Sequence, residues 1–159
     1  MLSVRQGVLG GLLVLALGCG AVGVVTAADD PAATIAARRD LMKNRGKEMG
    51  IINDFVENKK GSAADVVAAA KALEDSAAKI PGLFPKGTSL DDFPGKTGAK
   101  PVIWEKWDDF KKASEYFGSE AKELAEVAET GDAAKIAEHF GEVGKGCGGC
   151  HTTFRQKLN

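Results

Sequence analysis

Cys147-Gly148-Gly149-Cys150-His151 is the stretch of the chain that says most about its fold and chemistry. Two cysteines separated by two residues and followed directly by histidine form the attachment pattern of a c-type haem. On a helix, side chains three and four residues apart share one face, so both thiols can reach the vinyl groups along one porphyrin edge. The histidine can then bind the iron as an axial ligand. We therefore predict one covalently attached haem c, anchored by Cys147 and Cys150, with His151 as an iron ligand.

Other cofactor motifs share parts of this spacing but lack the context that they need. A thioredoxin-like Cys-x-x-Cys needs a βαβ setting, and nothing in the sequence reads as strands. A structural zinc site needs four ligands, whereas the chain has only one further cysteine, Cys19, and one further histidine, His139. His139 lies 12 residues before His151, about 18 Å along a helix axis, so it cannot reach the opposite face of the same haem. The letters Gly144-x-Gly146-x-x-Gly149 match a dinucleotide fingerprint, but no strand precedes them.

The rest of the chain reads as helices, because alanine is abundant and β-branched runs are nearly absent. Asp30-Pro31 predicts the start of a helix that runs to about Asn58, and Ser62 with Asp65 resembles the capping box of a second helix. Gly131-Asp132 predicts the end of a third helix and the cap of a fourth. Each helix has an inward-facing apolar stripe. The stripes are Ile35, Met42, Met49, Ile52 and Val56; Val66, Ala70, Leu73, Ala77 and Ile80; Ile103, Trp107, Phe110, Phe117, Ala121, Leu124 and Ala128; and Ile136, Phe140, Val143, Cys147, Cys150, Phe154 and Leu158.

The last stripe places both cysteines on the apolar face of the fourth helix, so the haem is expected to point into the core. Four amphipathic helices predict an all-α fold, an antiparallel up-down-up-down four-helix bundle with a covalently bound haem near the C-terminus. Residues 81–101 hold four of the five prolines and predict a long connection. Apolar residues within it indicate that it wraps the bundle rather than leaving it.

Residues 1–28 are predicted to be a signal peptide rather than part of the fold. Arg5 supplies a positive charge, an apolar stretch follows, and Thr26-Ala27-Ala28 is a small-residue cleavage site. The stretch is near the length that spans a bilayer, so a retained membrane anchor is one alternative, and lipidation at Cys19 is another. Because haem c is attached outside the cytoplasm, we expect a periplasmic domain over residues 29–159 with no integral membrane span in the mature chain.

The charge balance bears on the partners of the chain. With 21 basic and 22 acidic residues the formal net charge is −1, which gives no support for nucleic-acid binding. By elimination, the expected partners are small redox proteins, or respiratory or photosynthetic electron donors and acceptors. We expect no enzymatic activity, because peroxide chemistry would need a distal acid–base group and the first helix offers none but arginines.

Four segments together resemble one known family. They are Arg38-Arg39-Asp40-Leu41-Met42-Lys43, Ile80-Pro-Gly-Leu-Phe-Pro85, Pro101-Val-Ile-Trp104, and the C-terminal run from Cys147 to Lys157. The chain resembles the class II cytochromes c, the family of cytochrome c-prime and the low-spin c-556 type. The resemblance implies that the first segment faces the distal side of the haem. It also implies a homodimer through the first two helices as one oligomeric state.

The resemblance implies two functions, which differ in the role of Met42. In the c-556 type, a methionine at this position completes a six-coordinate, low-spin iron suited to electron transfer. In c-prime members the iron is usually five-coordinate and binds nitric oxide or carbon monoxide, and a methionine there only fills the distal site. We expect an electron-transfer protein with His151 and Met42 as metal ligands, and a gas-binding c-prime protein as the alternative. The resemblance also implies that Arg38 binds a haem propionate, with a solvated arginine as the other reading.

Overall fold

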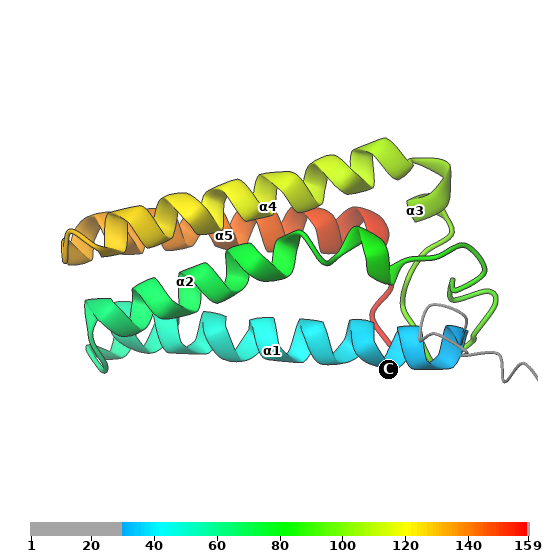
Figure 1. Ribbon diagram of the computed structural model, residues 1–159, viewed down its shortest axis with the longest axis horizontal. Coiled ribbons are helices and arrows are strands. Elements are labelled where there is room, and N and C mark those ends of the chain that lie inside the picture. Colours follow the sequence, from blue (N-terminus) through cyan, green and yellow to red (C-terminus); the bar gives the residue numbers. More distant parts are fainter. Residues whose placement is uncertain (1–29, 159) are drawn as a thin grey trace, which may run out of the picture.

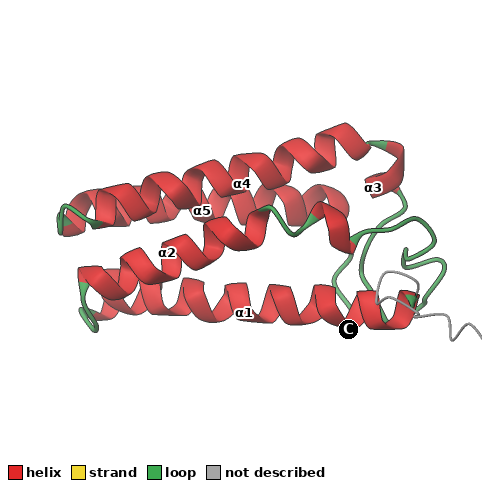
Figure 2. Ribbon diagram, in the orientation of Figure 1, coloured by secondary structure: helices red, strands yellow, loops and turns green. Residues whose placement is uncertain are grey.

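The computed structural model of the protein describes residues 30–158, which form a bundle of long helices (Figures 1 and 2). The long helices are α1 (Pro31–Asn58), α2 (Ala63–Ala77), α4 (Trp107–Ala128) and α5 (Ala133–Phe154). A short 3₁₀ helix, η2 (Pro81–Leu83), and a short helix, α3 (Val102–Glu105), lie between α2 and α4. Consecutive long helices run antiparallel (Figure 1), so the predicted up-down-up-down bundle is confirmed.

The part of the chain that the structure describes contains no β-strand, only an isolated bridge between Ala99 and Arg155. No helix within residues 30–158 is long and apolar enough to cross a membrane. The predicted signal peptide over residues 1–28, with Cys19, lies outside the described residues.

The helix starts have the local chemistry that their sequences predict. The Asp30 side chain accepts a hydrogen bond from the Ala32 amide at 2.9 Å, and Pro31 occupies the first turn of α1. At α2, the Ser62 hydroxyl accepts from the Asp65 amide, while the Asp65 carboxylate accepts from the Ser62 amide at 2.8 Å. This reciprocal capping box satisfies amides that no helical carbonyl could reach.

The predicted third helix is divided in two, which corrects the expectation of one continuous helix. α3 ends at Glu105 and α4 begins at Trp107, because Lys106 leaves helical geometry with φ −117° and ψ 49°. The tryptophans on the two sides of the break make different contacts. The indole of Trp104 donates a hydrogen bond to the Phe84 carbonyl at 2.9 Å, while Trp107 stacks on Phe110. The connection is thereby attached to the start of α4.

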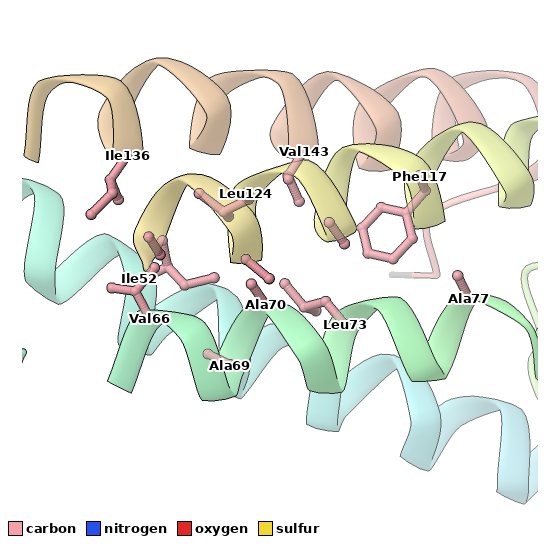
Figure 3. Close-up of a cluster of buried hydrophobic side chains, with 13 residues drawn as sticks. Ile52, Val66, Ala69, Ala70, Leu73, Ala77, Phe117, Leu124, Ile136 and Val143 are labelled. Atoms are coloured by element: carbon pink, nitrogen blue, oxygen red, sulfur yellow. The ribbon is translucent and has the colours of Figure 1, made fainter. Parts of the chain in front are cut away.

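The apolar stripes of the four long helices meet in a first core cluster (Figure 3). Its fully buried members include Ile52 from α1, Leu73 from α2, Leu124 from α4 and Val143 from α5. Burial of an aliphatic side chain of this size contributes about 1.5–3 kcal/mol. α1 packs mainly against α2, and α5 mainly against α4, so α1 and α5 share little direct contact. The bundle is therefore least tightly closed between α1 and α5.

A second core cluster lies where the connection over residues 81–101 wraps the end of the bundle. It contains Ile80, Phe84, Ala99, Ile103, Phe110 and Phe154. The connection also pairs with the segment after α5: the Lys100 amide donates to the Phe154 carbonyl at 3.0 Å, and the Gln156 amide donates to the Gly98 carbonyl at 2.7 Å. These two hydrogen bonds hold the segment after α5 against the connection.

Replacing Gly98 with alanine is expected to lower the free energy of unfolding by about 1–3 kcal/mol, the usual cost of overpacking. A Cβ at this position would overlap the Gln156 carbonyl oxygen, which is backbone and cannot rotate away. Denaturant unfolding followed by circular dichroism measures the change. Gly82→Ala is the matched control, because a Cβ there meets nothing within 4 Å. Equal denaturation midpoints for the two variants would contradict the prediction.

Candidate haem site

The five-residue motif lies near the end of α5 and presents its two thiols to the interior. Cys147 and Cys150 are half-buried, whereas Gly148 and Gly149 between them are exposed. Cys147 packs against the first core cluster, and Cys150 packs against the second. The two thiols predicted as anchors are thus held on one helix face at the junction of the two clusters, as their three-residue spacing requires.

A cavity of about 540 Å³ opens beside the motif, between α1 and α5. Its volume lies within the range of about 300–1,000 Å³ that is usual for ligand and cofactor sites. All five residues predicted for the site line this cavity, although they are far apart in sequence: Arg38, Met42, Cys147, Cys150 and His151. Its apolar wall comes from the turn after α2, the connection, α3, α4 and α5, and consists mainly of Ile80, Phe84, Ile103, Phe110, Phe117 and Phe154.

Two glycines shape the cavity in opposite ways. A Cβ on Gly146 would lie 3.3 Å from the Cα of Phe117, so the absence of a side chain lets α5 approach α4 closely beside Cys147. Gly46 borders the cavity from α1, where a Cβ would meet nothing within 4 Å. The backbone of α1 therefore borders open space directly. A flat, mainly apolar group with two attachment points beside the thiols fits between α1 and α5, which is the shape and chemistry of haem c.

Burial and nearby cations set the protonation states of the motif. Burial raises the pKa of Cys147 and of Cys150, and Arg45 opposes this effect less strongly, so both groups are thiols at neutral pH. A thioether forms when the sulfur adds to one vinyl carbon and the hydrogen to the other, so attachment needs no oxidant. Burial, and then the positive charges of Arg155 and Arg45, lower the pKa of His151. These effects favour the neutral imidazole, which is the form that binds iron.

α1 forms the cavity wall across from the motif. Met42 is half-buried there, and its Sδ lies 3.7 Å from Nη1 of Arg45. Met49 also borders the cavity, but it lies seven residues further on, about 10.5 Å along the helix axis, and it packs against the first core cluster. Met42 thus stands between Arg38 and Arg45 along the α1 wall, and its ligation of iron stays a prediction.

Arg38 is buried against the connection over residues 81–101. The alternative prediction, an arginine exposed to solvent, is therefore wrong. Its side chain is only 5% exposed and makes four hydrogen bonds: Nε to the Leu83 carbonyl, Nη1 to the Thr88 carbonyl and the Thr97 hydroxyl, and Nη2 to the Thr88 hydroxyl. It also stacks on Phe84 at 3.9 Å. Burial lowers the pKa of Arg38 to about 10, so it stays charged at neutral pH.

These bonds use four of the five N–H donors of the guanidinium. Arg38 therefore clamps the connection to α1, a role that no local sequence pattern indicates. One donor remains for the propionate that the family resemblance implies.

Arg45 is the cavity residue that reasoning from the sequence missed. Its guanidinium carbon lies 3.7 Å from the ring centroid of Phe117, on the inner side of α1. The available signal was its position three residues after Met42, since such residues share one face of a helix.

His139, the other histidine of the chain, does not line the cavity. Its Nδ1 instead lies 4.0 Å from Oε2 of Glu123 on α4.

Comparisons with known proteins agree on one family for most of the described chain. Residues 33–155 match the family model described as Cytochrome C'. A cytochrome c' from Pararhodospirillum photometricum is 32% identical over 126 residues, which cover 79% of this chain and 98% of that protein. A cytochrome c-556 from Agrobacterium fabrum is 33% identical over 141 residues, which cover 88% of this chain and 90% of that protein.

Solved structures agree with the sequence relatives. A cytochrome c' with an unusual ligand-controlled dimer dissociation matches with a TM-score of 0.74 and 33% identity, over 80% of this chain and 98% of the other. A nitric oxide complex of a mutant cytochrome c prime from Alcaligenes xylosoxidans matches with a TM-score of 0.70 and 26% identity, over 80% and 98%. A carbon monoxide-bound variant of that protein matches with a TM-score of 0.71 and 26% identity, over the same shares.

Proposed function

The chain belongs to the cytochrome c′ family and is a c-type cytochrome with one haem c, and we propose that it binds nitric oxide or carbon monoxide at a five-coordinate iron. In this proposal His151 is the protein ligand, and the opposite face of the haem is the gas site. The observation that carries the proposal is the likeness to solved cytochromes c′ that hold nitric oxide or carbon monoxide. The sequence-based expectation of a low-spin electron carrier has weaker support than this alternative.

The residues of the chain have separate tasks in this proposal. Cys147 and Cys150 hold the porphyrin by its vinyl edge, so the cofactor cannot dissociate. The phenylalanines give the cavity a mainly apolar wall, which favours neutral diatomic ligands over water. A haem in this cavity supplies an iron with one coordination position left for a gas. Met42, on the α1 wall, would fill space beside that position and would not be an iron ligand.

A His/Met-ligated electron carrier is the second candidate, and one observation favours it. The Met42 side chain lines the cavity from the side opposite the motif, and a thioether there has the chemistry of an iron ligand. The similarity to a cytochrome c-556 agrees with this candidate. The two functions differ in what they predict for the wild-type protein: a gas binder binds the gas with Met42 in place, whereas the electron carrier binds it only after Met42 is replaced.

In the ferrous protein, Met42→Ala is expected to raise carbon monoxide affinity about tenfold, or about 1.4 kcal/mol. The reason is steric, since the shorter side chain leaves room at the open position of the iron. Absorption spectra recorded during a gas titration measure the affinity and the spin state. Wild-type protein should already be high-spin and should bind the gas. Met49→Ala is the control, because this methionine lines the cavity about two turns away. A low-spin wild type that binds no gas until Met42 is removed would instead establish the electron carrier.

We also propose export to the periplasm with cleavage near Ala28, and small redox proteins as electron donors or acceptors. The family supports both, and the described helices include none that could span a membrane. A homodimer has the support of one solved relative whose dimer dissociates under ligand control. On α2, Ala64 and Ala68 are exposed and available for such a contact, whereas Ala69 is buried in the first core cluster.

A further inference from the structure

The cavity collects positive charge although the whole chain is nearly neutral. Six basic residues line it, and no aspartate or glutamate does: Arg38, Arg39, Lys43, Arg45, Lys96 and Arg155. Four of these are exposed at the rim, and the guanidinium of Arg38 is already hydrogen-bonded to the connection. Arg45 is the basic residue whose guanidinium lies inside the cavity without hydrogen bonds of this kind. The chain thus places an available cation on the inner wall of a mainly apolar site.

The contacts of Arg45 leave its hydrogen-bond donors open to a ligand. Its guanidinium carbon lies over the Phe117 ring, at 3.7 Å from the ring centroid. A cation–π contact supplies no oxygen or nitrogen acceptor, so it leaves the five N–H donors of the guanidinium in need of a hydrogen-bond partner. The polar contact found for Arg45 within residues 30–158 is with the Met42 sulfur at 3.7 Å, and none of the ion pairs there includes it. Sulfur is a weak acceptor, so an oxygen or nitrogen anion would bind these donors better.

The position of Arg45 separates it from the haem propionates. Its charge acts on Cys147, Cys150 and His151, so it lies near the attachment motif. The thioethers hold the vinyl edge of the porphyrin, and the propionates leave from the opposite edge. Arg38 lies seven residues earlier on α1, about 10.5 Å away along the axis, among the threonines of the connection. Arg38 is therefore the better candidate for a propionate, and Arg45 faces the haem nearer its anchored edge.

We propose that Arg45 makes the gas site a site for small anions as well, by donating hydrogen bonds to an anion bound at the ferric iron. The inference rests on the proposed open coordination position. Its ligand class is the monovalent anion with a nitrogen or oxygen donor atom, such as azide or nitrite. A charge-assisted hydrogen bond in an apolar cavity discriminates strongly between an anion and a neutral gas. The site therefore responds to the charge of a ligand as well as to its size.

Azide titration of the ferric holoprotein, followed by absorption spectroscopy, tests the inference. Arg45→Leu is expected to weaken azide binding about 10- to 100-fold, the range for hydrogen bonds to charged groups. The same variant should bind carbon monoxide in the ferrous state within about threefold of wild type. Arg45→Lys, which keeps the charge, should recover part of the azide affinity. Lys43→Leu is the matched control: it removes an equal charge from the cavity rim and should change azide binding less than about threefold.

Several outcomes would overturn the inference and leave the proposed function standing. One is unchanged azide affinity in Arg45→Leu with normal carbon monoxide binding. Another is an equal loss of azide affinity in Lys43→Leu, which would point to long-range charge alone. If wild-type protein binds neither ligand, the proposed function fails. The pair Met42→Ala and Met42→Ala/Arg45→Leu then tests Arg45, because the iron is open in both, and equal azide affinities in this pair would overturn the inference.

Discussion

Protein that carries alanine at both Cys147 and Cys150, prepared without haem, is expected to lose most of its cooperative thermal unfolding. The haem would fill the cavity of about 540 Å³ between α1 and α5, which otherwise have little contact with each other. An unfilled apolar cavity of this volume would cost on the order of 10 kcal/mol, comparable with the whole stability of a domain. The helices should therefore collapse into a loosely packed state. Far-UV circular dichroism during heating measures the loss as a broad transition.

Gly148→Ala is the matched control for the cysteine variant. It changes the same turn of α5, and a Cβ there meets nothing within 4 Å, so haem attachment and the sharp transition should persist. A sharp transition near the wild-type temperature in the haem-free double variant would refute the prediction. It would mean that the four-helix core folds cooperatively without the haem.

Arg38→Leu is expected to lower the free energy of unfolding of the holoprotein by about 3 kcal/mol or more. Arg38 is 5% exposed, and its guanidinium makes four hydrogen bonds to the connection. Each hydrogen bond to a charged group contributes about 1.5–3 kcal/mol, and the variant removes the guanidinium donor from the buried Thr88 carbonyl. The bonds act together, so their contributions do not add fully. Denaturant unfolding and protease cleavage within residues 81–101 both report the loss.

Arg39→Leu separates this effect from a simple loss of charge. Arg39 is the next residue on α1 and is exposed, so its replacement should change stability by less than about 0.5 kcal/mol. Equal effects of the two variants would contradict the clamp. If Arg38 also binds a propionate, Arg38→Leu should in addition shift the reduction potential of the haem. If Arg38 only clamps the connection, the potential should be unchanged when it is measured under conditions in which the variant is folded.

The helix boundaries were predictable because the interactions that set them are local. Asp30, Ser62 and Asp132 each cap a helix within three residues of their own position. The division at Lys106 was not predictable in this way. It accompanies a contact between residues distant in sequence, the hydrogen bond from the Trp104 indole to the Phe84 carbonyl 20 residues earlier. An apolar stripe continues across the break, so periodicity alone favours one helix.

The haem site was predictable in part for the same reason. Cys147, Cys150 and His151 lie within five residues, and helical geometry alone places the two thiols on one face. The sequence pattern of α1 did not show what surrounds Arg38 or Arg45: the family resemblance gave Arg38 a role, and the spacing of Arg45 from Met42 indicated only a shared helix face. Their different environments depend on Thr88 and Thr97 in one case and on Phe117 in the other, which lie 50 or more residues away along the chain.

The sequence by itself determined the helical class, the helix ends and the covalent haem motif, because each depends on residues within a few positions of one another. Only the tertiary structure decided that α1 and α5 stay apart to leave a cavity, that the connection is clamped by Arg38, and that Arg45 lies inside. These features result from packing between segments distant in the chain, where the free energy of burying one side chain depends on all its neighbours. A local sequence pattern does not show which distant residues will pack around a side chain.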